Sequence, residues 1–91
     1  MKREIRIGEL VISLAGHDKG DRFLVTGKEG GYLLLCDGKR RKAKNCKRKK
    51  EKHLFGTGVV CPWVENQPER INNTSVKTAL KQLRDQAEEV K

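Results

Sequence analysis

Apolar residues alternate with polar ones, or fill short continuous runs, through residues 8–61, and this period of two predicts β-strands. The first run covers residues 8–15, where Leu10, Ile12 and Leu14 share one face of the chain. Further runs at 22–26 and 32–36 follow turns that are rich in glycine, at 16–20 and 27–31. We therefore expect three neighbouring antiparallel strands.

The next segments are more polar. Asp37-Gly38 is a strong signal for a two-residue hairpin and predicts that the chain reverses into a short basic strand at 40–44. Residues 47–52 carry too much charge for a core element, so we expect a loop or arm there. The apolar pattern resumes at 53–55 and 57–61, which predicts the last strand, and Pro62 and Pro68 indicate a linker.

The period changes from two to 3.6 at Asn73. The apolar stripe has the i, i+3, i+4, i+7 spacing of an amphipathic helix, with Asn73 or Thr74 as its N-cap. It consists of Val76, Ala79, Leu80, Leu83, Ala87 and Val90. We expect this helix to pack on the strands; a docking helix for a protein partner is the alternative.

Short strands with glycine-rich turns indicate a small antiparallel β-barrel. The first and third strands are apolar on both faces, so one face fills the interior and the helix covers the other. Phe23 and Tyr32 lie in strands and are expected in the core. The chain then divides into a barrel at 1–63 with a basic arm at 39–53, a linker at 64–73 and a helix at 74–91.

Charge is concentrated in one segment of the chain. The formal net charge is +9, and residues 39–53 hold ten Lys or Arg and one Glu, which is also a net of +9. The remaining eleven basic and eleven acidic residues balance. Such asymmetry is typical of a protein that binds a polyanion.

Other chemistry has weak support. Cys36, Cys46 and Cys61 are widely spaced, which favours free thiols over a disulfide framework or a zinc knuckle. The chain shows no paired carboxylates, nucleophile elbow or dinucleotide-binding motif, so we expect neither an enzyme nor a cofactor. It also shows no membrane-spanning run and no export signal, which favours the cytoplasm.

The strand, loop and strand at residues 8–25 resemble a KOW motif, with Gly16, Lys19 and Gly20 at its loop positions. Phe23 stands where many KOW motifs have another glycine. Together with Asp37-Gly38-Lys39 and Arg41-Lys42, residues 8–54 are similar to the large-subunit ribosomal protein L14e group, and more closely to its small bacterial relatives. The resemblance implies an SH3-like antiparallel β-barrel of KOW type that binds RNA.

The expected function is non-catalytic binding of ribosomal or other structured RNA through phosphate contacts, by a monomer associated with the large ribosomal subunit. Gly16 and Gly20 are expected to shape the loop. The predicted contact residues are His17, Lys19, Lys39, Arg40, Arg41, Lys42, Lys44, Lys47, Arg48, Lys49, Lys50, Lys52 and His53. The alternatives are a protein-interaction module and a protein that binds anionic membranes through the basic arm.

Overall fold

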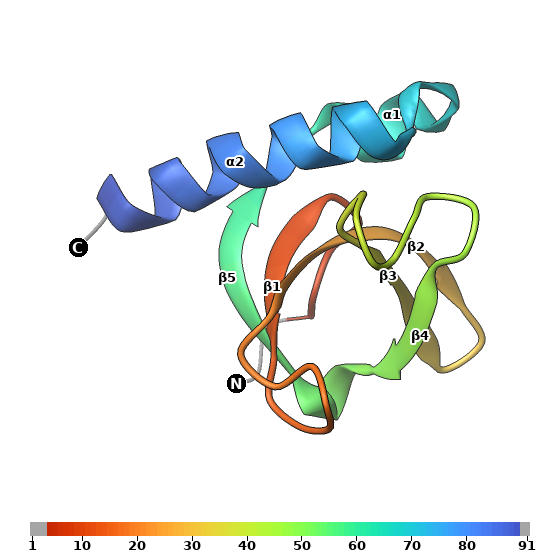
Figure 1. The fold of residues 1–91 in the computed structure, drawn as a ribbon, viewed down its shortest axis with the longest axis vertical. Coiled ribbons are helices and arrows are strands. Elements are labelled where there is room, and N and C mark those ends of the chain that lie inside the picture. Colours follow the sequence, from red (N-terminus) through yellow and green to blue (C-terminus); the bar gives the residue numbers. More distant parts are fainter. Residues whose placement is uncertain (1–3, 90–91) are drawn as a thin grey trace.

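The computed structural model describes residues 4–89, with side chains for residues 4–87, as a five-stranded antiparallel sheet and a C-terminal helix (Figure 1). Residues 1–3 and 90–91, which the sequence assigns to the barrel and the helix, lie outside this range. The elements are β1 (Glu9–Ser13), β2 (Arg22–Glu29), β3 (Tyr32–Cys36), β4 (Lys47–Lys50), β5 (Leu54–Val60), α1 (Trp63–Asn66) and α2 (Asn73–Glu89). The predicted antiparallel sheet with a C-terminal helix is confirmed.

The sheet is strongly curled. Its strand order is β4-β3-β2-β1-β5, so β4 and β5 are opposite edges, yet only the 3₁₀ turn Glu51–His53 joins them. Four strand spacings would separate the edges of a flat sheet by about 19 Å, whereas the four Cα–Cα steps from Lys50 to Leu54 reach only about 14 Å. The edges therefore approach each other. Within residues 4–89 no ladder pairs β4 with β5, so the sheet is curled but its two edges are not joined by strand pairing.

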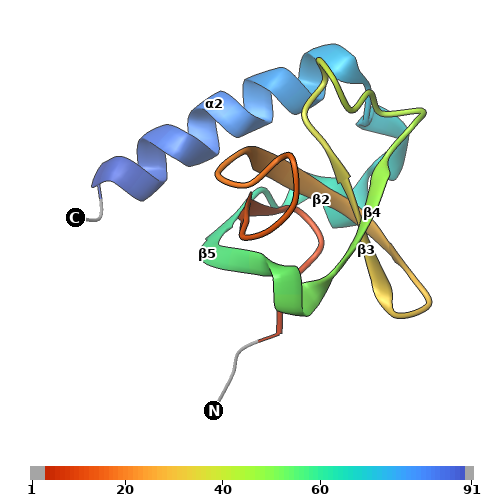
Figure 2. The same ribbon diagram turned by 60° about the horizontal axis from the view of Figure 1, so that its bottom comes forward.

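Two apolar clusters fill the two faces of this sheet. Inside the curl lie Ile5, Val11, Phe23, Val25, Leu33, Leu35 and Leu54. On the outer face, Leu10 and Leu24 pack against Val76, Ala79 and Leu83 of α2. Figure 2 shows the helix running along the outside of the sheet. The strands that are apolar on both faces are thus buried on both faces, and the apolar stripe of the helix covers the outer face.

The fourth strand is not where the sequence places it. Residues 40–44 belong to a ten-residue connection, 37–46, and the strand is Lys47–Lys50, which had been expected as an arm. Because strand residues alternate, Lys47 and Lys49 point to the side of Leu35 and Leu33 with which they pair. A buried carboxylate on another segment makes this placement of two lysines possible.

Three smaller differences concern exposure and capping. The expected linker contains α1 and the 3₁₀ turn Pro68–Arg70, and it buries Val64. Tyr32 is 41% exposed, because it lies at the end of β3 away from α2, with the Lys50 ammonium over its ring. Asn72, and neither Asn73 nor Thr74, caps α2 by accepting a hydrogen bond from the Ser75 N–H. None of the helices in the described range is long and apolar enough to cross a bilayer.

Candidate nucleic-acid interface

The loop at 16–20 is built around a buried carboxylate. Gly16 and Gly20 have φ of 85° and 91°, which glycine adopts without strain. Between them, Asp18 turns inward, and its Oδ1 accepts hydrogen bonds from the Ser13 hydroxyl and the Lys49 ammonium, both at 2.7 Å. The Lys47 ammonium pairs with the other oxygen, Oδ2. The loop is therefore tied to β4 by two ion pairs.

Burial alone would raise the pKa of Asp18, but hydrogen bonds from Lys47, Lys49 and Ser13 outweigh it and hold the pKa well below its usual range. The Lys49 ammonium also donates to the Ala15 carbonyl at 2.6 Å and to the Ser13 hydroxyl at 2.7 Å. We call Asp18, Ser13, Lys47 and Lys49 the Asp18 cluster. Two of the predicted RNA contacts, Lys47 and Lys49, thus have partners inside the chain.

The connection 37–46, the basic loop, is fixed at several points. Asp37 Oδ1 accepts hydrogen bonds from the backbone N–H groups of Lys39 and Arg41, at 2.8 and 2.9 Å. Asn73 Oδ1, at the start of α2, accepts the Ala43 N–H at 2.9 Å. Asp37 therefore fixes the first turn of the basic loop, and it forms no ion pair with another described side chain.

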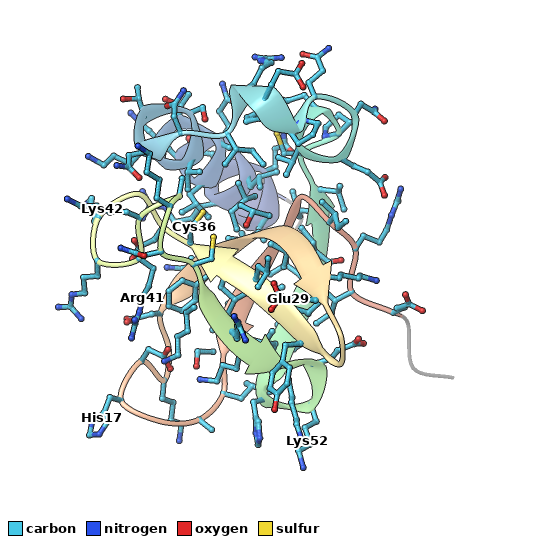
Figure 3. All side chains as sticks on the ribbon, turned by 90° about the vertical axis from the view of Figure 1, so that its right-hand side faces the viewer. His17, Glu29, Cys36, Arg41, Lys42 and Lys52 are labelled. Carbon is cyan, nitrogen blue, oxygen red and sulfur yellow. The ribbon has the colours of Figure 1, made fainter. Side chains whose placement is uncertain are left out.

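Five predicted contact residues project from this loop. All are exposed, and none forms an ion pair with a described side chain: Lys39, Arg40, Arg41, Lys42 and Lys44. Figure 3 shows Arg41 and Lys42 on the same side of the molecule as His17. The structure therefore brings the loop at 16–20 and the basic loop to one side, as an RNA-binding surface would require.

A groove of about 450 Å³ runs between the basic loop, the start of β2 and the polar side of α2. We call it the basic groove. Its lining has six cations and two carboxylates, with Leu80 in its wall: Arg22, Lys39, Arg40, Lys77, Lys81, Arg84, Asp21 and Asp37. A formal charge of +4 is thus gathered in one concave site (six cations less two carboxylates).

A second hollow of about 330 Å³ adjoins the basic groove, and Arg40, Asp21 and Asp37 line both. His17 and Arg41 line only the second hollow, along with Lys47 and Asp18 of the Asp18 cluster. The two hollows together lead from α2, across the basic loop, to the loop at 16–20. The lining of the second hollow has three cations and three carboxylates, so the excess positive charge is concentrated in the basic groove.

The other predicted contacts lie elsewhere. Lys19 is exposed but lines neither hollow. Arg48 pairs with Glu29 at 3.1 Å, and Lys50 lies over Tyr32, so both occupy the outer face of β4. Lys52 lies at the end of the molecule away from α2 (Figure 3), and His53 is half-buried beside it in the same 3₁₀ turn.

The sequence prediction missed the contribution of the helix. Lys77, Lys81 and Arg84 are spaced i, i+4, i+7, so they follow one side of α2 over about 10 Å. Taken alone, this spacing describes an ordinary solvated face. The apolar stripe predicts which side of the helix packs on the sheet, but it does not predict which loop lies beside the charged side.

The two hollows offer positive charge and hydrogen-bond donors. Among the described residues, no three His, Cys, Asp or Glu side chains come together in a way that could hold a metal ion. All three cysteines are free thiols. Comparisons with protein-family models and with curated protein sequences gave no match.

Proposed function

We propose that this protein binds structured RNA without catalysis, holding the phosphate backbone in the basic groove. The observation that carries the proposal is the six-cation lining of that groove, with only two carboxylates, one of them bound to backbone N–H groups. Arg side chains donate to two phosphate oxygens at once, and Lys side chains act as point charges. Such contacts position a protein on RNA, and specificity then comes from RNA shape.

The placement of the aromatic residues supports structured RNA over unstacked single strands, because Phe55, at 54% exposed, lines neither hollow. Phe23 is buried, and the ring of Tyr32 already carries the Lys50 ammonium. A stacking platform for single-stranded bases needs free aromatic faces on an exposed groove. The basic groove has none in its lining, so contacts to it are electrostatic.

The proposal includes the finer fold assignment. A curled five-stranded antiparallel sheet with short connections is consistent with an SH3-like barrel, and residues 8–54 resemble the KOW motif and the ribosomal protein L14e group. On this basis we propose a cytoplasmic, monomeric protein that contacts ribosomal RNA, with the large ribosomal subunit as its partner. No cofactor is needed for this role.

The binding test is a salt titration against a structured RNA, a DNA duplex and anionic vesicles. About six phosphate contacts predict a roughly 10³-fold loss of RNA affinity between 50 and 200 mM salt. Binding to the vesicles that equals or exceeds RNA binding at physiological salt would overturn the proposal in favour of a membrane role.

Three triple variants separate the groove from net charge, because each removes three cations. The basic-loop variant is K39Q/R40Q/R41Q, the helix variant is K77Q/K81Q/R84Q, and the control on the far side is R48Q/K50Q/K52Q. With up to about 1 kcal/mol for each exposed charge pair, the first two variants should lose up to roughly 100-fold in RNA affinity. Each should also flatten the salt slope by about two to three units. Equal losses in all three variants would mean that net charge, and not the groove, holds the RNA.

A further inference from the structure

Two of the three thiols face each other at the base of the basic loop. Cys36 is the last residue of β3, and Cys46 directly precedes β4. The β3–β4 ladder pairs Leu35 with Lys47, and continuing it by one residue places Cys36 opposite Cys46. Figure 3 shows Cys36 at this end of β3, next to the loop that carries Lys42.

The side chains confirm this juxtaposition. Cys36 belongs to the apolar cluster on the outer face of the sheet, and Cys46 packs against that cluster. Thr26 Oγ1 lies 3.4 Å from the Cys46 sulfur, and that sulfur also donates to the Ala43 carbonyl at 3.3 Å. Opposed residues of an antiparallel pair have Cα atoms about 4.5–5.5 Å apart, which is within the range of about 4.4–6.8 Å that a disulfide bridges. The backbone needs little adjustment to join the two sulfurs.

The two thiols differ in access. Cys46 is half-buried, whereas Cys36 has no exposed surface. Burial raises the pKa of Cys36 to about 12, which makes it a poor first nucleophile. Cys61 is 7% exposed and packs in the cluster beneath α2, so it serves as an internal control. An external disulfide would therefore react first at Cys46.

We propose that Cys36 and Cys46 are a redox-active dithiol whose disulfide braces the basic loop. The Cys46 thiolate attacks one sulfur of a small disulfide such as oxidised glutathione, which gives a mixed disulfide and releases one glutathione thiolate. The Cys36 thiolate then attacks the Cys46 sulfur and displaces the second glutathione. Two electrons pass from the protein to glutathione, and the protons of the two cysteines end on the two released thiols.

The bridge would close the loop across its base. Asp37 and Asn73 already fix the loop at Lys39, Arg41 and Ala43. A covalent bond across its base prevents this segment from opening in the folded state. It also lowers the chain entropy of the unfolded state. The consequence for RNA contacts rests on the proposed function, but formation of the bridge does not.

The test uses the folded full-length chain in buffers of increasing oxidised-to-reduced glutathione ratio, followed by acid quench and peptide mapping by mass spectrometry. The expected product is a single Cys36–Cys46 disulfide, with slower amide hydrogen exchange in residues 38–46 and unchanged exchange in α2. C61S should give the same product, whereas C46A should give none. C36A should trap glutathione on Cys46. Because Cys36 is buried, circular dichroism checks that the C36A variant is folded. If C36A unfolds, C46A still tests the proposal.

Three outcomes would overturn the proposal. One is stable glutathionylation of Cys46 in the unmutated chain, since Cys36 would then fail to resolve it. The second is oxidation of Cys61 as readily as of the pair. The third is that all three thiols stay reduced while oxidised glutathione is in large excess. None of these results depends on RNA, so failure here leaves the RNA-binding proposal standing.

Discussion

Replacing Asp18 with Asn should destabilise the fold strongly. The amide keeps the shape and one acceptor of the carboxylate but removes its charge, so the Lys47 and Lys49 ammonium groups lose their shared counter-ion. The exposed fractions of the Lys49 and Lys47 side chains are 10% and 24%. Lys49 therefore remains largely cut off from water, while Lys47 is able to turn outward.

The magnitude follows from this difference in burial. Breaking a buried pair by removing one partner costs about 3–5 kcal/mol, since it leaves an uncompensated charge. Because Lys47 is partly exposed, we expect the lower end, about 3 kcal/mol. A chain of this length has a free energy of unfolding of roughly 5–14 kcal/mol, and each kcal/mol shifts Tm by about 4–8 °C. The Tm of the variant should fall by more than 10 °C.

Urea unfolding at several pH values is the assay, with the free energy of unfolding taken by linear extrapolation. The folded-state pKa of Asp18 is depressed below the unfolded value of about 3.9, so its contribution is complete at neutral pH. It is lost as pH falls below about 5, because the unfolded state then binds more protons than the folded state. The difference between the original protein and D18N should therefore shrink steadily toward pH 3.

Two variants guard the interpretation. D21N removes an exposed carboxylate three residues away and should change the free energy of unfolding by less than about 0.5 kcal/mol. Adding K49M to D18N should recover part of the loss, because the stranded charge is then gone. The reasoning is refuted if D18N unfolds within about 0.5 kcal/mol of the original protein at pH 7, or if its effect is independent of pH.

Two further predictions test the packing of the basic loop and of α2. Gly38 has φ of 79°, and a Cβ there would lie 2.5 Å from the Asn73 carbonyl oxygen. G38A should therefore lower the free energy of unfolding, measured with urea, by about 2–4 kcal/mol. G31A is the control, because a Cβ at Gly31 meets open space, and it should be near neutral. Equal effects of the two would contradict the docking of the loop on α2. Leu24 is fully buried between the sheet and α2, so L24A should lower the free energy of unfolding by about 2–5 kcal/mol. The control L14A, at a site that is 49% exposed, should lower it by less than about 1 kcal/mol. A small effect of L24A would argue against a packed helix.

Local patterns were enough to predict the apolar strands and the helix. The runs that contain Val11 and Leu35 are apolar on both sides, which predicts a sheet that is buried on both faces. The apolar stripe through Val76 and Leu83 predicts the helix that covers the outer face. The position of β4 was not predictable in this way. Its residues are four consecutive cations, and the group that stabilises the inward pair, Asp18, lies about 30 residues earlier in the chain.

The residues of the candidate site could be predicted only where local sequence carries the signal. A one-signed charge cluster is visible in the sequence, which is why Arg40 and Arg41 were identified. Which cations have partners is a tertiary property, so Lys49 looked equivalent to them. Lys77 and Lys81 were overlooked because a helix face with mixed charge carries no sign of what lies beside it until the helix is docked.

The placement of consecutive strands β4 and β5 on opposite edges has a consequence for how the chain folds. Closing the ladder between β1 and β5 pairs Glu9 with Val60 and Ser13 with Leu54, residues that are distant in the sequence. The β2–β3 hairpin needs only the turn at 30–31. Loop-closure entropy therefore favours early formation of the hairpin and late arrival of β5. Folding should take milliseconds or longer, with transition-state contacts concentrated around Val25 and Leu35 and few at Val60.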